Sequence, residues 1–448
     1  MLNKTMATTE RKSFFGHFTN VCTRIFDRYL PDPLVIVVLI TIAIMATGII
    51  LKGHTPTAML NYWMDGFWTL HTFAMQMVLI LVAGFVVATT PLFKHLVSRV
   101  ACAAKTPGSA IVLVTLVSLA ASWLNWGIGL VVGAVLAKEL AKRIAGVDYR
   151  LLISSAYSGF LIWHAGLSGS VPLTLATPGN FLEESVGLIP TNLTLFSAFN
   201  ITLVVTMFIV LPLTNYLLMK SIDKPFTLTA NTDEPKHCKA KITRPAEHIE
   251  QALWPALLIA IMGFAGITTY AVQGGGLNLN IIIFALLFAG IGLHKSLRNF
   301  LDQMNEAVKG ASGVIIQFPF YAGVMGMMSQ SGLASDFAQL FVDISSADTL
   351  PVWSFLSAGI INMFIPSGGG QWAVQGPILM EAAQALNADV PKVAMAFAWG
   401  DSWTNMLQPF WALPALAIAG LKARDIMGYC AIVMLVTGAI IGLALLLG

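Results

Sequence analysis

The sequence predicts an all-α polytopic membrane protein with nine transmembrane helices and two re-entrant hairpins, arranged as two inverted repeats. Three observations predict this fold class: the composition, the lengths of the apolar segments and the placement of the basic residues. Hydrophobic residues make up 56% of the 448-residue chain and charged residues only 10%, whereas soluble domains carry about 25% charged residues. This shortage of charge excludes an ordinary soluble protein.

Nine apolar segments are long enough to cross a membrane as helices, which takes roughly 20 residues. They are residues 34–51, 71–91, 151–176, 194–218, 251–272, 279–294, 311–330, 391–418 and 426–447. The segment 1–33 precedes them and combines apolar residues at helical spacing with arginines and lysines. This pattern suits a helix at the cytoplasmic interface of the membrane, or an amphipathic helix that packs on the protein itself.

Two further apolar stretches, 109–137 and 352–380, are interrupted in the middle by turn-forming residues. The first contains Trp123–Gly129, and the second contains Pro366–Trp372 with three consecutive glycines. Proline and glycine are the poorest helix formers, and flanking halves of about 14 residues are too short to span a membrane. We therefore predict that both stretches enter the membrane and turn back, with their irregular backbone buried in protein.

The placement of the basic residues tests this topology. With the N-terminus in the cytoplasm and each hairpin returning to the side it left, 23 of the 25 lysines and arginines fall in cytoplasmic segments. Only Lys52 and Lys392 fall on the other side. An excess of basic residues in cytoplasmic loops is expected of membrane proteins. Counting either hairpin as a full crossing destroys this asymmetry, so the charges support the hairpins as well.

The order of segments also predicts an internal repeat. The hairpin tips at Gly127 and Gly368 are about 240 residues apart, as are the similar segments Ala83–Phe85 and Ala322–Val324. One additional crossing between the repeats inverts the second relative to the first, an architecture common in secondary transporters. The predicted units are a first repeat at 34–218, a basic cytoplasmic linker at 219–250, a connecting transmembrane helix at 251–272 and a second repeat at 279–448.

Two predicted spans are broken by polar residues, Gly and Pro at corresponding places, 163–172 and 400–409. Such interruptions in matching halves indicate the binding site of a transporter. Unwinding a helix frees N–H groups that favour an anion, and it frees oxygens that suit a hard cation such as Na⁺. Candidate substrate-binding residues at the breaks and hairpin tips are Asn125, Gly127, Ser168, Ser170, Ser367, Gly368, Gly369, Gln371, Thr404 and Asn405.

Asp401 is a carboxylate near the middle of a predicted span, where an ionisable group is costly and is therefore a functional candidate. It can bind a cation or carry a proton, and His164 is the second candidate for coupling. Each also has a structural interpretation, Asp401 with neighbouring Ser, Trp and Thr donors and His164 as a hydrogen-bonded core residue. The candidate ligands of Na⁺, the one cofactor suggested, are Asn125, Ser367, Asp401 and Asn405.

Several functional classes lack their sequence signatures. The net charge of +3 is too small to imply a nucleic-acid partner. None of the four cysteines forms a CxxC pair, and there is no GxxxxGK[ST] loop for an ATP-driven pump. The one enzyme-like pair is Ser168 near His164, a weak signal without further motif context. The sequence therefore favours a carrier over an enzyme.

Long motifs carry a family resemblance. They are Tyr29–Pro33, Asn125–Ala134, Leu167–Ser170, Ala176–Asn180, Pro366–Trp372 and Gly400–Pro414. In these segments the chain resembles the short-chain fatty acid transporter family of the wider ion-transporter superfamily. The resemblance implies uptake of small monocarboxylates such as acetoacetate or butyrate, and a homodimer with a scaffold and a mobile transport domain. Superfamily relatives carry Ser-Asn-Thr hairpin tips that bind Na⁺. The two predicted tips of this chain depart from that motif, so the resemblance does not fix the number of Na⁺ sites.

The leading hypothesis is a multi-pass protein of the bacterial inner membrane, with a cytoplasmic N-terminus and a periplasmic C-terminus. It imports a small carboxylate with Na⁺ or H⁺ by an elevator-like movement. Its expected partners are the substrate, the lipid bilayer and a second copy of the chain. The alternatives are an exporter or cation/proton antiporter on the same scaffold, and a channel for small anions.

Overall fold

The computed structural model describes residues 33–222, 225–227, 244–309, 311–363 and 367–447. These residues form helices, turns and loops, and no strand occurs among them. The predicted N-terminal interfacial helix, most of the basic linker and residues 364–366 of the second hairpin tip lie outside the described residues.

In the first half of the chain the elements are α2 (Pro33–Ile50), α3 (Pro56–Phe67), α4 (His71–Ala88), α5 (Pro91–Ala101), α6 (Pro107–Leu124), α7 (Trp126–Arg143), α8 (Tyr149–Ser158), η1 (Gly159–Ala165), α9 (Ser170–Leu175), α10 (Glu183–Val186) and α11 (Ala198–Lys220). Helices α12 (Pro245–Gln251) and α13 (Leu253–Val272) come between the two halves. The elements of the second half are α14 (Leu279–His294), α15 (Leu297–Lys309), α16 (Ser312–Gln330), α17 (Leu333–Ile344), α18 (Leu350–Asn362), α19 (Gly368–Ala385), α20 (Val390–Thr404), η2 (Asn405–Leu407), α21 (Pro409–Ala419) and α22 (Ala423–Leu447).

Apart from α10, the described elements of the two halves follow the same order. Each begins with two helices, continues with a long helix and a short one, and then has a helix pair, a broken helix and a long final helix. The pairs are α6–α7 and α18–α19, and the broken helices are α8–η1–α9 and α20–η2–α21. Each half therefore has a helix pair at the position of a predicted hairpin and a broken helix at the position of a predicted break.

Within the described residues, five helices are long and apolar enough to cross a membrane: His71–Ala88, Pro107–Leu124, Ala198–Lys220, Pro245–Val272 and Ala423–Leu447. The expected length of about 14 residues is wrong for three of the four hairpin halves, because α6, α7 and α19 each contain 18 residues, whereas α18 contains 13. The short helices α3, α5, α15 and α17 were not among the predicted spans, since none has a full-length apolar run.

Local sequence signals set where the first helices begin. Thr55, Thr90 and Thr106 precede α3, α5 and α6, and their side chains accept hydrogen bonds from first-turn N–H groups. A proline follows each threonine at the start of the helix. Its fixed φ suits that position, where the missing N–H has no intrahelical partner.

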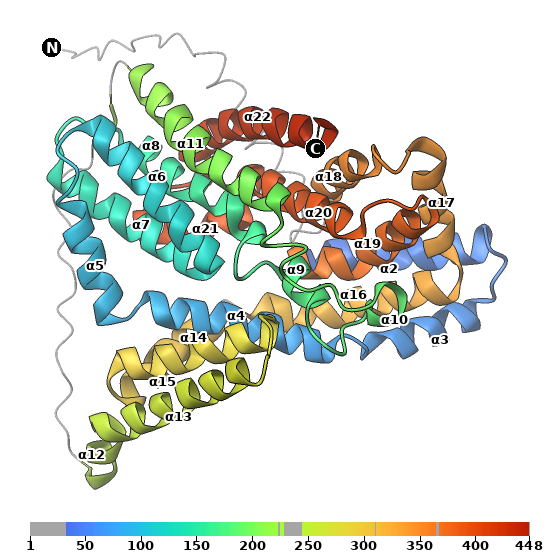
Figure 1. The fold of residues 1–448 in the computed structure, drawn as a ribbon, viewed down its shortest axis with the longest axis horizontal. Coiled ribbons are helices and arrows are strands. Elements are labelled where there is room, and N and C mark those ends of the chain that lie inside the picture. The colour runs from blue at the N-terminus through green and yellow to red at the C-terminus, as the bar shows by residue number, and fades with distance from the viewer. Residues whose placement is uncertain (1–32, 223–224, 228–243, 310, 364–366, 448) are drawn as a thin grey trace, which may run out of the picture.

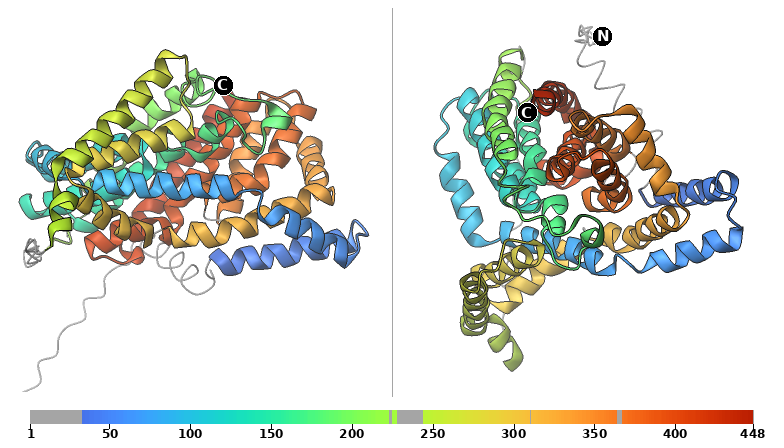
Figure 2. Two further views of the ribbon diagram at one scale, coloured as in Figure 1. Left: turned by 90° about the horizontal axis from the view of Figure 1, so that it is seen from below. Right: turned by 45° about the vertical axis from the view of Figure 1, so that its right-hand side comes forward.

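The elements form two groups that lie on opposite sides of the molecule (Figure 1). Helices α2–α4 and α13–α16 make a layer along one side, and the hairpins and broken helices lie on the other side (Figures 1 and 2). Helix α4 packs on α14 within the layer and on α7 of the first hairpin, while α16 packs on α2, α3 and α19. The layer therefore supports both hairpins.

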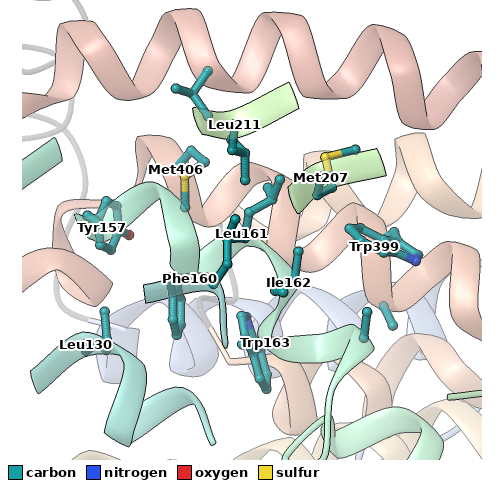
Figure 3. Close-up of a cluster of buried hydrophobic side chains, with 14 of the residues drawn as sticks. Leu130, Tyr157, Phe160, Leu161, Ile162, Trp163, Met207, Leu211, Trp399 and Met406 are labelled. Carbon is teal, nitrogen blue, oxygen red and sulfur yellow. The ribbon is translucent and has the colours of Figure 1, made fainter. Parts of the chain in front are cut away.

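The largest hydrophobic cluster surrounds the first broken helix. Phe160, Leu161 and Trp163 of η1 are buried in it. Met207 and Leu211 of α11 lie next to Leu161 in the same cluster (Figure 3). This packing holds the irregular segment in place next to the functional residues.

Candidate functional site

The first helix break is a tight 3₁₀ segment, η1, between α8 and a turn at Gly166. A 3₁₀ helix has three residues per turn, so every third side chain is eclipsed. Tyr157 stacks on Phe160 with ring centroids 5.9 Å apart, and Phe160 stacks on Trp163 at 5.8 Å. Trp163 in turn stacks on His164 at 4.2 Å. This stack of rings holds His164 at the end of the broken helix.

The second helix break lies between α20 and α21. The Asn405 amide group donates to the carbonyl oxygen of Asp401 at 2.7 Å, and the Tyr157 hydroxyl donates to the carbonyl of Asn405 at 2.7 Å. Carbonyls released by the break are thus bound by side chains, as buried backbone groups require. Tyr157 also connects the two breaks.

His164 and Asp401 meet between the breaks. His164 Nδ1 lies 2.8 Å from Asp401 Oδ2, and both side chains are buried. The Val171 N–H donates to His164 Nε2 at 3.2 Å, and Ser170 Oγ lies 3.0 Å from the same atom. Because Nε2 accepts from Val171, the proton of a neutral His164 is on Nδ1 and is donated to Asp401.

The structural alternative for Asp401, a carboxylate satisfied by Ser, Trp and Thr donors, does not match these contacts. Oδ2 is bound by His164, whereas Oδ1 is buried without a hydrogen-bond partner in the described part of the chain. The described contacts therefore satisfy one oxygen of the Asp401 carboxylate, through His164 and not through Ser, Trp or Thr.

The second hairpin tip touches His164 through Gly368. A Cβ added at Gly368 would lie 2.8 Å from both His164 Cε1 and Trp163 Cη2, and one at Gly369 would lie 3.0 Å from Phe73 Cζ. Only glycine fits such close contacts without displacing these rings. Ser367 Oγ accepts the N–H of Gly370 at 3.2 Å and caps α19. The start of α19 is thereby placed beside His164.

The first hairpin tip is held by side chains that cap α7. Asn125 Oδ1 accepts the N–H groups of Gly127 and Ile128 at 2.9 and 3.1 Å. Ser168 Oγ accepts the N–H of Trp126 at 2.9 Å. Ser168 therefore connects the first tip to the first break, whereas Asn125 caps α7 within the tip. A role of Asn125 as a cation ligand would compete with its helix cap.

Two residues of the site were missed by sequence reasoning. Asn362, the last residue of α18, donates to the Asp401 carbonyl at 2.6 Å and to Thr404 Oγ1 at 2.9 Å. Gln408 donates from its side-chain amide to the Asn362 carbonyl. Both residues could have been found in the sequence as amide side chains close to a hairpin tip or a helix break. Gln371 lies apart from these contacts and donates to the Ala358 carbonyl at 2.8 Å.

Four buried amide side chains of the second hairpin and the second helix break share one feature. Their NH₂ groups are hydrogen-bonded, whereas their oxygens are buried and have no donor among the described residues. These oxygens are Asn362 Oδ1, Gln371 Oε1, Asn405 Oδ1 and Gln408 Oε1, together with Asp401 Oδ1. Buried acceptors without donors are uncommon, and oxygen ligands suit hard cations. No group of three or more His, Cys, Asp or Glu side chains suited to a metal ion occurs in the described residues.

Comparison with known proteins decides the family. A family model described as "Short chain fatty acid transporter" matches residues 14–447. The chain belongs to the short-chain fatty acid transporter family. It is 44% identical over 439 residues to a protein of Escherichia coli (strain K12), covering 96% of this chain and 99% of the relative. It is 42% identical over 432 residues to a protein of Haemophilus influenzae, covering 93% and 96%. Both relatives are named, provisionally, as short-chain fatty acid transporters.

A solved structure shares the fold of this transporter. The YdaH transporter of Alcanivorax borkumensis superposes with a TM-score of 0.57 at 16% sequence identity, covering 92% of this chain and 98% of that one. With the apolar helices, the family makes the protein a multi-pass membrane transporter rather than an enzyme. The enzyme-like pair of Ser168 and His164 is not formed: Ser170 contacts His164, and Ser168 binds the Trp126 amide.

Proposed function

We propose that this transporter imports short monocarboxylates such as acetoacetate or butyrate across the bacterial inner membrane, coupled to Na⁺ or H⁺. Membership of the short-chain fatty acid transporter family supports the substrate class. The observation that carries the coupling is the buried Asp401, one of whose oxygens is bound by His164 while the other has no partner in the described residues.

The charge of this pair gives the physical reason for coupling. With His164 neutral, an ionised Asp401 leaves a net negative charge in the protein interior, and an uncompensated buried charge is costly. A second negative charge, the substrate carboxylate, makes an empty cation position more costly still. A proton on Oδ1, or Na⁺ held there, removes this penalty. Cation loading and substrate loading are then mutually favourable.

The proposed Na⁺ ligands centre on Asp401 and Asn405. Asn362 and Gln408 add buried side-chain oxygens near them. The Asn362 amide group donates to the Asp401 carbonyl, and the Gln408 amide group donates to the Asn362 carbonyl. Asn125 and Ser367, the other two candidate ligands, would have to give up their helix caps to bind the cation. Asp401 with its amide neighbours is therefore the preferred position.

The proposed topology has nine crossings, two re-entrant hairpins and two inverted repeats, with a cytoplasmic N-terminus and a periplasmic C-terminus. The distribution of lysine and arginine supports it, as do the buried tips at Asn125 and Gly368. We further propose that the hairpins and broken helices move as a body against the layer of α2–α4 and α13–α16. A homodimer would hold this layer fixed in the membrane.

Uptake of labelled butyrate into proteoliposomes tests the proposal. We expect accumulation that depends on an inward Na⁺ gradient or an inward H⁺ gradient, measured separately. Uptake that responds to neither gradient would reject coupling, and no uptake of any short monocarboxylate would reject the substrate class. Accumulation driven only by an outward cation gradient would indicate the exporter or antiporter instead.

A further inference from the structure

We propose that Trp163 binds the substrate carboxylate through its indole N–H, and that a surrounding aromatic wall selects short alkyl chains. The aromatic wall is defined as Trp126, Phe160, Trp163 and Trp411. This inference rests on the proposed function and deepens it, because it assigns residues to the two ends of the transported acid.

The first observation is a buried donor without an acceptor. Trp163 is 4% exposed, and its Nε1 atom has no hydrogen-bond partner within the described residues. Its ring is fixed between Phe160 and His164, with interplanar angles of 13° and 14°. A rigid buried donor of this kind is expensive to leave unpaired and is therefore a candidate for ligand binding.

The second observation is the position of the indole edge relative to α19. A Cβ at Gly368 would lie 2.8 Å from Trp163 Cη2 and 3.1 Å from Cζ2. Cζ2 is separated from Nε1 by a single ring carbon, so the N–H belongs to the part of the ring that faces the start of α19. Gly368, at the start of the 18-residue helix α19, thus lies against the ring edge next to the indole nitrogen.

The donor set at this point fits a carboxylate. The first four N–H groups of a helix have no intrahelical acceptor, and the helix dipole favours an anion there. Ser367 Oγ accepts the N–H of Gly370, whereas the Gly368 and Gly369 N–H groups precede the first intrahelical bond. Together with the Trp163 N–H they offer several donors to two carboxylate oxygens.

The third observation is the aromatic wall itself. Trp126 of α7, Trp163 of η1 and Trp411 of α21 are in mutual contact, with ring centroids 5.5 to 6.3 Å apart. Phe160 completes the wall at 5.6 Å from Trp411, and Figure 3 shows it beside Trp163 on the same segment. Phe160 and Trp163 are buried, while Trp126 and Trp411 are half-buried.

A carboxylate held at the start of α19 directs its alkyl chain against this wall. Each methylene that becomes buried strengthens binding about fourfold, so a short chain gains affinity from the rings. A longer chain meets rigid rings supplied by three different elements. Because interiors are close-packed, such rings do not yield to additional methylenes. The wall therefore selects against long chains by steric exclusion.

Two substitutions test separately the binding of the carboxylate and the binding of the alkyl chain. Trp163→Phe keeps a stacked ring and removes the N–H, so we expect the half-saturation concentration for butyrate uptake to rise about tenfold, as for loss of one bond to a charged group. The preference among chain lengths should stay the same. Trp126→Ala removes part of the wall, and we expect uptake of hexanoate relative to butyrate to rise about tenfold.

Trp254→Ala is the matched control, since Trp254 is 64% exposed on α13 and lies outside the wall. An unchanged half-saturation concentration in Trp163→Phe would overturn the carboxylate role, and an unchanged hexanoate ratio in Trp126→Ala would overturn the wall. Should Trp126→Ala not fold, Trp411→Leu replaces it with the same expected result. Absence of uptake by the unmodified protein under every gradient would reject the proposed function rather than this inference.

Discussion

His164 Nδ1 lies 2.8 Å from Asp401 Oδ2, and this contact joins the two broken helices across 237 residues of sequence. The same imidazole is held from its other side by Ser170 and the Val171 N–H. A movement of one helix break relative to the other must therefore stretch or break a buried bond to a carboxylate. Such bonds are costly to break when no water replaces them.

The first prediction concerns the charge of Asp401. In Asp401→Asn the side-chain oxygen still accepts the proton on His164 Nδ1, so the contact and the fold should persist. An amide cannot exchange a proton and is a weaker cation ligand than a carboxylate. We expect gradient-driven butyrate accumulation to fall by about tenfold or more, which corresponds to about 1.4 kcal/mol, while butyrate exchange at equal cation concentrations continues.

Asp389→Asn provides the control for this substitution. Asp389 caps α20 by accepting the Lys392 N–H at 3.1 Å, and asparagine is an equally good cap. Driven accumulation should be unchanged in this variant. If Asp401→Asn accumulated butyrate as well as Asp389→Asn does, Asp401 would have no part in coupling.

Hydropathy made the long helices predictable because each is a continuous apolar run. Residues 279–294 were predicted as a span and form α14 with the same bounds. Amphipathic α15 and α17 were missed because polar and charged residues interrupt their apolar residues within a short segment. Their burial depends on packing against neighbouring helices, which a hydropathy pattern does not contain.

The candidate site was predictable residue by residue but not as a set of contacts. Asp401 stands out because a carboxylate is costly in an apolar span, yet nothing in the sequence pairs it with His164. Asn362 was missed because its acceptor, the Asp401 carbonyl, becomes available only where the helix breaks. Asn125 was predicted as a ligand, whereas the rule that Asn precedes a helix would have predicted its capping role.

The second prediction concerns the close approach of α18 and α20. A Cβ at Gly400 would lie 2.1 Å from the backbone oxygen of Phe355, whereas one at Gly442 meets no atom within 4 Å. We expect Gly400→Ala to lower the free energy of unfolding by about 3 kcal/mol, because backbone cannot move aside easily. Gly442→Ala should raise it by about 0.5–1 kcal/mol, since alanine favours a helix.

Thermal unfolding in detergent, followed by tryptophan fluorescence, measures both variants under the same conditions. Opposite shifts of the unfolding temperature are expected. Equal shifts would show that the contact between Gly400 and Phe355 does not limit packing of the second hairpin on the broken helix.

The third prediction concerns the interior of the first hairpin, where α6 and α7 meet through small residues. A Cβ at Gly133 would lie 2.3 Å from Ser118 Oγ but 3.3 Å from the Cβ atoms of Ser118 and Ala156. Ser118 Oγ is buried and has no hydrogen-bond partner in the described ranges. The hydroxyl is thus the main obstacle to a larger residue at position 133, and its removal breaks no bond there.

Gly133→Ala alone should lower the free energy of unfolding by about 1–3 kcal/mol through overpacking. Ser118→Ala alone should be neutral or slightly stabilising, because a buried hydroxyl without a partner contributes no hydrogen bond. The double variant should recover most of the loss, which gives a coupling energy of about 1–2 kcal/mol between the two positions. Denaturant or thermal unfolding of the four proteins closes this cycle. If the two changes in the free energy of unfolding were strictly additive, α6 and α7 would be packed less tightly at this point than the distances require. The hairpin would then not be the rigid unit that an elevator-like movement needs.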